Sequence, residues 1–431
     1  MKKIDWYRDF VNLKYKPSKD DVVCLFRFEP SANISKTEAA GRIASESSAG
    51  TWTTLTSLPR TIEKVKARSF EIHGNFVKVA YPIDIWEPAN IPQLLSGIAG
   101  NIFGMKALKN LKLMDVSLPV SYTKHFRGPE FGIDEIRKIL KVRKRPITGA
   151  VAKPKIGWNA SEHAKIAYET WMGGFDLVKD DENLTSIWFN KFEQRVRLCS
   201  KMRDKAEKET GQRKSALINI TGETSQMIKR AKMLHDFGLE YAMIDVVTVG
   251  FSALQTLRET CHDYKIAIHA HRAMHAAFDR NPSHGLSMLF LAKICRLIGV
   301  DQLHIGTVVG KLVGTRHEVL DIKNEITQDN IRNKGSSMLD QRWNKIKPVL
   351  PVSSGGIHPG IIPDVLNIMG TDIALLVSGG VHGHPNGTRA GAMAAMQSIE
   401  ATMQNVSLSE YAKSHTELGI ALEKWGYFRP Q

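Results

Sequence analysis

Short apolar segments alternate with amphipathic segments from about residue 146 towards the C-terminal end of the chain. Eight apolar segments have the length of buried strands, and a stretch with helical periodicity follows each of them. Regular strand–helix alternation implies a parallel sheet, and eight such units predict an α/β fold of the closed (β/α)8, or TIM, barrel type. A doubly wound open sheet is the alternative, but no Gly-rich nucleotide-binding fingerprint follows the first expected strand. The expected strands are 147–152, 175–179, 216–220, 242–246, 266–269, 302–305, 349–352 and 373–377, and the expected helices are 160–172, 190–210, 225–237, 250–262, 285–298, 318–326, 359–369 and 391–402.

The first 128 residues lack this regular alternation and predict a separate α+β domain. The expected strands there are 22–28, 76–81 and 111–118, and the expected helices are 35–47 and 92–105. A linker is expected at 125–132. We therefore predict two domains, an N-terminal α+β domain over 1–128 and a barrel domain over 129–431 that carries the metal and phosphate sites.

The chain of 431 residues has a formal net charge of +15, which raises the question of nucleic-acid binding. Its Lys and Arg residues are spread along the sequence without a basic tail, so attraction of phosphorylated substrates explains the charge as well. The four Cys residues lie far apart, which argues against a zinc site or a disulfide framework and for a reducing compartment. The N-terminus lacks a signal-peptide pattern and no apolar run is long enough for a membrane span, so a cytoplasmic protein is expected.

The stretch from Gly173 to Asn183 begins as an apolar strand and ends in a group of charged residues. Side chains alternate along a strand, so Lys179 and Asp181 are expected on one side and Asp180 on the other. The carboxylates of Asp181 and Glu182 suit Mg²⁺, which prefers oxygen ligands. An ammonium group repels a metal, but reaction of the neutral Lys179 amine with CO2 gives a carbamate, which is an oxygen ligand. The alternative is a solvated acidic turn.

Polar, charged or Gly residues stand at the end of every expected barrel strand. Functional groups of such barrels gather there, in the loops that follow the strands. A structural scaffold alone does not require this set, although each member taken singly is consistent with an ordinary loop, core or helix-cap residue. In strand order the residues are Lys153 and Lys155; Lys179, Asp181 and Glu182; Asn219; Asp245; His269, His271, Arg272 and His275; His304 and Lys311; Ser354, Gly355 and Gly356; and Ser378, Gly379 and Gly380.

The Gly-rich turns after the seventh and eighth strands are suited to phosphate, because they expose backbone N–H groups near helix N-termini. Arg272 and His304 offer a second anion site, since guanidinium matches phosphate oxygens. Two phosphate sites flanking a divalent metal imply a substrate phosphorylated at both ends. The metal would polarise a carbonyl and a neighbouring Lys would take a proton beside it. The residues therefore predict metal-assisted enolisation of a sugar bisphosphate.

Motifs along nearly the whole chain resemble those of the ribulose-1,5-bisphosphate carboxylase/oxygenase (RuBisCO) large-subunit family. The set stands in the family's order and spacing, and the phrases AGNIFGMKALKNLKL and MIDVVTVGFSALQ are most similar to its archaeal-type form III members. The motifs are ESSAGTW (46–52), GNIFG (100–104), GAVAKPK (149–155), GGFDLVKDDEN (173–183), HAHRAMH (269–275), HIGTVVGKL (304–312), SSGGIHPG (353–360) and GGVHGHP (379–385).

The resemblance implies carboxylation, and oxygenation by O2, of ribulose 1,5-bisphosphate through a Mg-stabilised enediolate, with two 3-phosphoglycerate as the carboxylation product. It also implies a ferredoxin-like fold for the N-terminal α+β domain. Lys179, carbamylated by activating CO2, would bind Mg²⁺ with Asp181 and Glu182. The expected catalytic residues are Lys153, the base of enolisation; Lys155, which helps protonate the product carbanion; His271, which assists proton transfer; Lys311, which stabilises the carboxylate formed from CO2; and Glu46, which orients Lys311.

The resemblance further implies a homodimer with shared active sites, and leaves open a higher oligomer of dimers. No nucleic-acid or membrane partner is expected. Part of each substrate pocket would come from the partner subunit's N-terminal domain. The expected substrate-binding residues are Thr51, Trp52 and Asn101 from that domain, and Arg272, His275, His304, Ser354, Gly355, Gly356, Ser378, Gly379 and Gly380 from the barrel.

Three residues depart from the family's pattern. Leu376 stands where a polar residue is usual, Ser378 where a third Gly is usual, and Val151 where a hydroxyl or a β-branched residue is common. The Cβ of Ser378 would crowd the phosphate site or its hydroxyl would donate to the phosphate. A RuBisCO-like enolase or isomerase that fixes no CO2 is the alternative function. The presence of Lys311 and Glu46 favours the carboxylase.

Overall fold

The structure, a computed structural model, describes residues 6–51, 53, 55–309, 315–332 and 338–428. The chain forms two compact units. The first comprises Met1–Gly128, Met274–Ile298 and Gln328–Ile346, and the second comprises Pro129–Ala273, Gly299–Thr327 and Lys347–Gln431. The domain limits 1–128 and 129–431 remain a prediction.

The first unit is built on an antiparallel sheet in the order β4-β1-β3-β2, to which β10 adds in parallel beside β4. Along the chain its main elements run β-α-β-β-α-β, which is the ferredoxin-like arrangement, and the predicted α+β fold is confirmed. The strands are β1 (Val22–Pro30), β2 (Arg68–His73), β3 (Phe76–Tyr81), β4 (Leu108–Ser117) and β10 (Gly285–Leu286); the main helices are α1 (Lys36–Glu46), α3 (Ile91–Ala99) and α12 (Met288–Ile298).

Short elements complete the first unit. They are the 3-10 helices η1 (Trp6–Phe10), η2 (Ile83–Ile85) and η3 (Asn101–Gly104), the short α-helices α2 (Ile62–Val65), α4 (Val120–Thr123) and α11 (Ala276–Asp279), and the strand pair β12 (Asn330–Ile331) and β13 (Gln341–Arg342).

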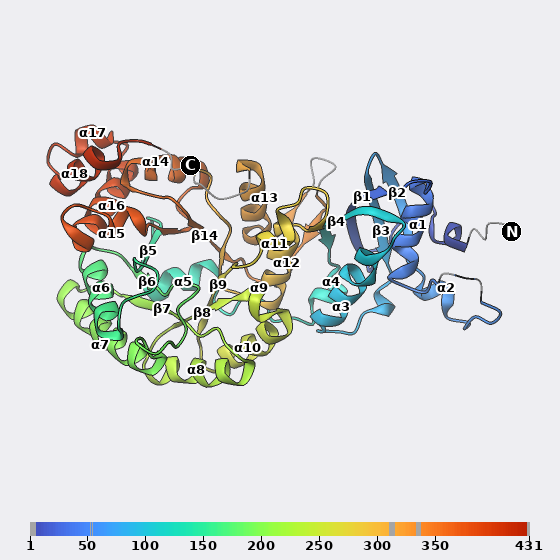
Figure 1. Ribbon diagram of the computed structural model, residues 1–431, viewed down its shortest axis with the longest axis horizontal. Coiled ribbons are helices and arrows are strands. Elements are labelled where there is room, and N and C mark those ends of the chain that lie inside the picture. The colour runs from blue at the N-terminus through green and yellow to red at the C-terminus, as the bar shows by residue number, and fades with distance from the viewer. Residues whose placement is uncertain (1–5, 52, 54, 310–314, 333–337, 429–431) are drawn as a thin grey trace. The chain divides into compact units, whose positions relative to one another are not determined.

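The second unit is a closed barrel of eight parallel strands, as predicted, so the open-sheet alternative is excluded (Figure 1). The strand order around the barrel is β11-β14-β15-β5-β6-β7-β8-β9, with β5 closing against β15. The strands are β5 (Ile147–Val151), β6 (Leu177–Lys179), β7 (Ser215–Asn219), β8 (Tyr241–Asp245), β9 (Ala267–His271), β11 (Gln302–His304), β14 (Leu350–Ser354) and β15 (Ala374–Leu376).

Helices surround this barrel (Figure 1). Most of their buried side chains are apolar. The helix α6 begins with a capping box, in which Asn159 accepts from the Glu162 N–H and Glu162 accepts from the Asn159 N–H. The helices of the unit are α5 (Gly132–Leu140), α6 (Ala160–Met172), α7 (Phe192–Thr210), α8 (Thr224–Asp236), α9 (Val246–Val249), α10 (Phe251–Asp263), α13 (Arg316–Thr327), η4 (Pro359–Ile361), α14 (Ile362–Met369), α15 (Gly379–His382), α16 (Gly387–Met403), α17 (Leu408–Tyr411) and α18 (Thr416–Trp425).

Several elements differ from the sequence prediction. The strand β9 extends to His271, so His271 lies within the strand, whereas the prediction ended this strand at His269. The predicted linker at 125–132 reaches the first residue of α5, and strand β2 was not predicted. The chain also continues beyond α16 into α17 and α18, whereas the predicted helices ended at 402. Gly and Pro near residue 130 conceal the start of α5 from a prediction by periodicity. The shortness and polar character of α17 conceal that helix.

A cluster of buried apolar side chains joins the barrel strands to α5. Buried Leu177, Leu217, Tyr241 and other strand residues pack there with Ile136 and Leu140 of α5. Burial of one such side chain contributes about 1.5–3 kcal/mol. This packing makes the barrel a rigid support for the side chains at the carboxyl ends of its strands.

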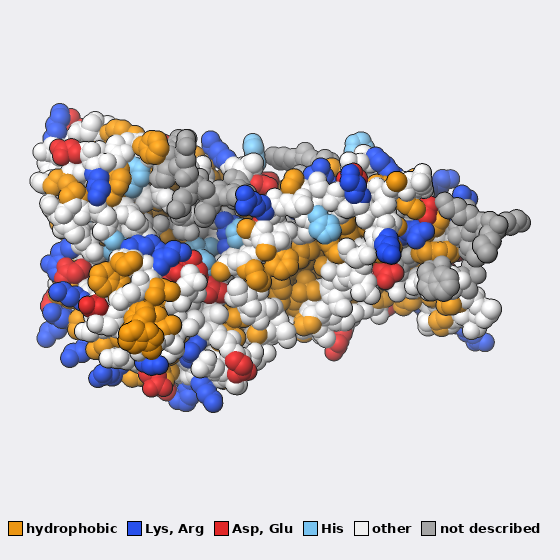
Figure 2. All heavy atoms as spheres, in the orientation of Figure 1, with side chains coloured by type: hydrophobic (Ala, Val, Ile, Leu, Met, Phe, Trp, Pro, Cys, Tyr) orange, Lys and Arg blue, Asp and Glu red, His pale blue; other side chains and the backbone are white. Residues whose placement is uncertain are grey.

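Charge is spread over the barrel unit. On its visible face Lys and Arg side chains are interspersed with Asp and Glu (Figure 2). This matches their distribution along the sequence. Among the described helices, none combines the length and the apolar character needed to cross a lipid bilayer.

Candidate active site

A cavity of about 620 Å³ opens at the carboxyl ends of the barrel strands. Its walls bring together predicted residues from six strands and the loops that follow them. The predicted residues that line it are Lys153, Lys155, Lys179, Asp181, Glu182, His271, His304, Ser354, Gly355, Gly356, Ser378, Gly379 and Gly380; the others are Val151, Ile357, His358, Leu376 and Trp425.

Lys179 is the last residue of β6 and its side chain is 1% exposed. Its Nζ donates to the Asp180 carbonyl oxygen at 2.9 Å. Burial lowers the pKa of Lys179, while the neighbouring carboxylates oppose that shift. A lowered pKa increases the neutral amine fraction, which is the form that reacts with CO2.

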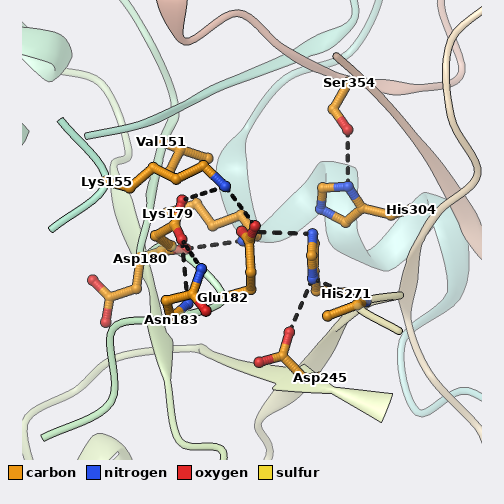
Figure 3. Close-up of polar contacts among 12 residues, drawn as sticks. Val151, Lys155, Lys179, Asp180, Glu182, Asn183, Asp245, His271, His304 and Ser354 are labelled. Carbon is orange, nitrogen blue, oxygen red and sulfur yellow. Dashed lines mark hydrogen bonds and ion pairs between the residues drawn. The ribbon is translucent and has the colours of Figure 1, made fainter. Parts of the chain in front are cut away.

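Asp180 points away from this group, as the alternation along the strand predicted (Figure 3). Its Oδ2 accepts from Arg195 Nε at 2.9 Å and from the Asn219 N–H at 2.9 Å, and its Oδ1 lies 3.1 Å from His163 Nε2. Although burial opposes it, the Arg195 charge and the His163 contact lower the pKa of Asp180. This carboxylate therefore anchors the β6 loop and faces away from the cavity.

The two carboxylates on the cavity side are held by lysines. Lys155 Nζ lies 2.7 Å from Glu182 Oε1 and 3.7 Å from Asp181 Oδ2, and Lys153 Nζ lies 3.4 Å from Asp181 Oδ2. Burial opposes ionisation of Glu182, but the hydrogen bond from Lys155, a backbone hydrogen bond and the charges of His271 and Lys179 together lower the pKa of Glu182 to about 2. The Asn219 side-chain amide donates to the carbonyl oxygens of Asp181 and Glu182 at 3.2 Å each, which fixes the loop.

These residues fit a hard divalent cation. Asp181 and Glu182 present carboxylate oxygens beside Lys179, whose carbamate would supply a further oxygen ligand. Within the described part of the chain, no cluster of three or more His, Cys, Asp or Glu side chains is placed to hold a metal. Asp181 and Glu182 supply two carboxylates, one fewer than such a cluster.

His271 lies opposite these carboxylates, at the end of β9 (Figure 3). Its Nδ1 is 2.9 Å from Asp245 Oδ1 and its Nε2 is 3.8 Å from Glu182 Oε2. Burial, together with the charge of Lys179, lowers the pKa of His271, while Asp245 opposes the shift. The imidazole is thus neutral near pH 7 and oriented by Asp245.

A chain of hydrogen bonds leads from the barrel interior to the cavity. Gln302 Oε1 is 2.6 Å from His269 Nδ1, His269 Nε2 is 2.9 Å from His304 Nε2, and His304 Nδ1 is 3.0 Å from Ser354 Oγ. Burial lowers the pKa values of both imidazoles well below the usual range. Neutral rings therefore fix the position of the Ser354 hydroxyl.

The glycine turns after β14 and β15 form one wall of the cavity. Gly355 and Gly356 have φ values of +112° and +72°, a conformation that side chains disfavour. A Cβ on Gly380 would come within 2.5 Å of the His358 Cα, so the two turns touch through their backbones. A Cβ on Gly379 would meet nothing within 4 Å, so this residue faces open space. The turns leave room for an anionic group.

His358 and Trp425 extend this wall. Their rings lie 5.9 Å apart at an interplanar angle of 31°, and His358 Nε2 is 2.6 Å from the Phe428 carbonyl oxygen. Trp425 was not predicted, because nothing in the pattern of α18 links it to a cavity more than forty residues earlier in the chain. Asp245 was recognised as a strand-end residue, but its role in orienting His271 required the structure.

The other predicted site residues lie outside this cavity's walls. Arg272 is buried, and a Cβ on Gly306 would come within 2.8 Å of its Nη2. His275 belongs to the first unit, where its Nδ1 is 2.7 Å from Asp279 Oδ2. Glu46 and Asn101 line a common cavity of about 330 Å³ in the first unit, and Thr51 follows α1 there. Trp52 and Lys311 lie outside the described residues.

Known proteins resemble this chain over its full length. A protein from Pyrococcus abyssi named ribulose bisphosphate carboxylase is 50% identical over 433 residues, which cover 100% of this chain and 99% of that protein. A protein of the same name from Methanocaldococcus jannaschii is 49% identical and covers 97% of this chain and 100% of its own length.

Solved structures also resemble this chain over nearly its full length. The dimeric archaeal Rubisco from Hyperthermus butylicus superposes with a TM-score of 0.94 at 48% identity, covering 98% of this chain and 100% of that chain. The octameric Rubisco from Pyrococcus horikoshii superposes with a TM-score of 0.92 at 50% identity, covering 98% of each chain.

Both domains of one family match the sequence. Residues 9–122 match the ribulose bisphosphate carboxylase large chain N-terminal domain, and residues 132–425 match the catalytic domain of the same family. Together with the relatives' identity over the full length, these matches show that the chain belongs to the RuBisCO large-chain family and is most similar to its archaeal members.

Proposed function

We propose that this protein carboxylates D-ribulose 1,5-bisphosphate, and oxygenates it with O2, through an enediolate, and that carboxylation yields two molecules of 3-phosphoglycerate. The observation that carries the proposal is the buried Lys179 beside Asp181 and Glu182, on the floor of a cavity whose other walls hold lysines, imidazoles and two glycine turns. Curated relatives with about half of their residues identical to this chain bear the carboxylase name.

Lys179 as a carbamate, Asp181 and Glu182 would hold Mg²⁺, and CO2 would thus be needed both as activator and as substrate. When bound, the cation supplies Lewis-acid polarisation of the substrate carbonyl, which acidifies the neighbouring C–H bond. The neutral His271, held by Asp245, is placed to relay a proton at the sugar hydroxyls.

Lys153 and Lys155 divide acid and base work between them. Burial lowers the pKa of Lys153, although Asp181 opposes the shift, and this suits a base that takes the proton at C3. The hydrogen bond to Glu182 raises the pKa of Lys155, which suits an acid that stays protonated and donates to the product carbanion. Groups whose environments push their pKa values apart are typical acid–base pairs.

The two phosphate groups of the substrate would lie at opposite sides of the cavity. One would contact Gly355, Gly356, Gly379 and Gly380, and the other would contact Arg272 and His304, with Ser354 between them. Glu46, Thr51, Trp52 and Asn101 would complete the site from the partner subunit of a homodimer, with Lys311 closing over CO2 and His275 in support. The joint lining of one cavity by Glu46 and Asn101 supports this part of the proposal. A cytoplasmic location is proposed as well.

The test is fixation of labelled CO2 after preincubation with Mg²⁺ and bicarbonate. Wild-type protein should convert ribulose bisphosphate to labelled 3-phosphoglycerate, and Lys179→Met should abolish this. Lys214→Met is the matched control, because Lys214 is also fully buried in the barrel unit but precedes β7 at the amino end. Full activity of Lys179→Met would contradict the carbamate assignment. Enolisation without CO2 fixation by the wild type would instead identify a RuBisCO-like enolase or isomerase.

A further inference from the structure

The turn after β15 is tied to the end of β5 by a side chain in place of a backbone ladder bond. The Val377 N–H donates to the Gly149 carbonyl oxygen at 2.9 Å, which is the last backbone bond between these strands that continues their pairing. The next backbone donor of β5 towards its carboxyl end is the Val151 N–H, and it donates to Ser378 Oγ at 2.9 Å. The hydroxyl of Ser378 therefore continues the ladder by one step.

The other end of the same turn contacts α16. His382, the last residue of α15, has its Nδ1 3.1 Å from Thr388 Oγ1. Burial and the nearby charge of Lys153 lower the pKa of His382 to about 4, with the Val151 carbonyl opposing the shift. The imidazole of His382 is thus neutral near pH 7. Ser378 therefore holds one end of the turn to β5, and His382 holds the other end to α16.

Between these two residues stand Gly379 and Gly380, which face the cavity and the neighbouring glycine turn, respectively. Lys153 follows Val151 by two residues, and both line the cavity. One short segment therefore contacts the strand that presents Lys153 and at the same time forms the wall assigned above to a phosphate group. A shift of this turn would move the end of β5 with it.

We propose that Ser378 is a positioning residue, which ties the phosphate-facing turn to the end of β5 and so sets the position of the Lys153 amine. The proposal rests on the proposed function, in which Lys153 takes the C3 proton. In this arrangement the side chain that replaces the family's usual Gly neither crowds the phosphate nor serves mainly as its donor. Its oxygen accepts from Val151, and its effect appears in proton abstraction.

Three variants separate these roles. Ser378→Gly removes both Cβ and hydroxyl, Ser378→Ala removes the hydroxyl alone, and Ser378→Thr keeps it. The measurements are exchange of the substrate C3 proton with solvent, which reports enolisation alone, and the KM for ribulose bisphosphate. We expect both Ser378→Gly and Ser378→Ala to exchange the proton about tenfold more slowly, with KM changed less, because misplacing a catalytic group lowers the rate of the chemical step. Ser378→Thr should restore most of the rate.

Other outcomes overturn the proposal. A lower KM in Ser378→Gly alone would mean that the Cβ crowds the phosphate. A higher KM at unchanged exchange rate in both variants would mean that the hydroxyl binds phosphate. Ser200→Ala is the control, because it also removes a serine hydroxyl that is hydrogen-bonded to the backbone, here by donating to the Arg197 carbonyl oxygen in α7, and it should leave exchange unchanged.

Amide hydrogen exchange at Val151 tests the tie without any turnover. Its protection should fall in Ser378→Gly and Ser378→Ala and persist in Ser378→Thr. Equal protection in all variants would refute the tie even if the protein is inactive. Failure of the wild type to exchange the C3 proton or fix CO2, by contrast, would refute the proposed function and leave the amide result to decide the structural claim.

Discussion

The amino end of the barrel and the cavity at its carboxyl end use buried charge in opposite ways. At the amino end two buried carboxylates each meet a guanidinium: Arg145 Nη1 and Nη2 lie 2.7 and 2.8 Å from the Asp176 oxygens, and Arg258 Nη1 lies 2.9 Å from Asp301 Oδ2. At the carboxyl end two lysines share one carboxylate, with Lys153 and Lys155 at 3.4 and 3.7 Å from Asp181 Oδ2.

The difference lies in how completely the charges are satisfied. Asp301 also accepts from the Phe131 and Ile268 N–H groups at 2.8 Å each, so its oxygens are fully engaged by fixed donors. At the cavity, the lysine contacts of Asp181 are longer, and burial has lowered the pKa of the neighbouring Lys179. Fixed pairs hold a fold together, whereas loosely held charges can rearrange around a ligand. The amino end is therefore built for stability and the carboxyl end for chemistry.

The largest effect is expected from breaking an amino-end pair. Asp301→Ala leaves Arg258 charged and buried, with a side chain only 2% exposed, and removes an acceptor from two backbone N–H groups. Burial raises the pKa of Asp301 although Arg258 opposes the shift, so the pair itself is costly, but an unpaired charge costs more. We expect the free energy of unfolding in urea to fall by about 3–5 kcal/mol.

The control for this variant is Glu410→Ala, which removes an exposed partner of Lys413. It should change the free energy of unfolding by at most about 1 kcal/mol. The specific activity of folded Asp301→Ala should remain close to that of the wild type. Loss of activity in the folded fraction would show that the amino end takes part in the chemistry, and the contrast between the ends would fail.

The carboxyl end was more open to prediction from sequence than the amino end. Residues such as Lys153, Lys179 and Ser354 could be predicted as site residues, because the fold does not require a charged or hydroxyl group at the end of an apolar strand. The alternation along β6 also separated Asp180 from Lys179 and Asp181 correctly. The physical reason is that the alternation of side chains along a strand fixes the face on which a side chain lies. The position of the strand end fixes how near that side chain is to the mouth of the barrel.

Partners far apart in the sequence were not predictable in this way. Arg258 and Asp301 are separated by 43 residues, and neither sequence segment carries a pattern that indicates its partner. The same holds for Trp425 beside His358 and for Ser378 beside Val151, where the sequence showed an unusual residue but not its contact. Such pairs depend on closure of the barrel, which brings β5 against β15 and α18 against the glycine turns.

An intermediate effect is expected from ligand binding at the carboxyl end. Mg²⁺ with bicarbonate should stabilise the wild type by about 2.7 kcal/mol at a hundredfold excess over the dissociation constant, since only the folded site binds them. Thermal unfolding with and without the two ligands measures this shift. Lys179→Met should lose it and Asp301→Ala should keep it. If Mg²⁺ and bicarbonate stabilised Lys179→Met as much as the wild type, the cation would bind elsewhere. The carboxyl end would then lose its assigned role in the chemistry.

The smallest effect, and the one of opposite sign, is expected from Lys179 itself when CO2 and Mg²⁺ are absent. Its amine is buried, makes one hydrogen bond at 2.9 Å to the Asp180 carbonyl oxygen, and has its pKa lowered by burial, so it costs stability in the resting protein. Methionine has a similar length and no charge, while Lys153 and Lys155 remain to pair Asp181 and Glu182. We therefore expect Lys179→Met to raise the free energy of unfolding by about 1 kcal/mol as it abolishes activity. A fall of that size would instead make Lys179 a structural counter-ion of the carboxylates, and the two ends of the barrel would then follow the same rule.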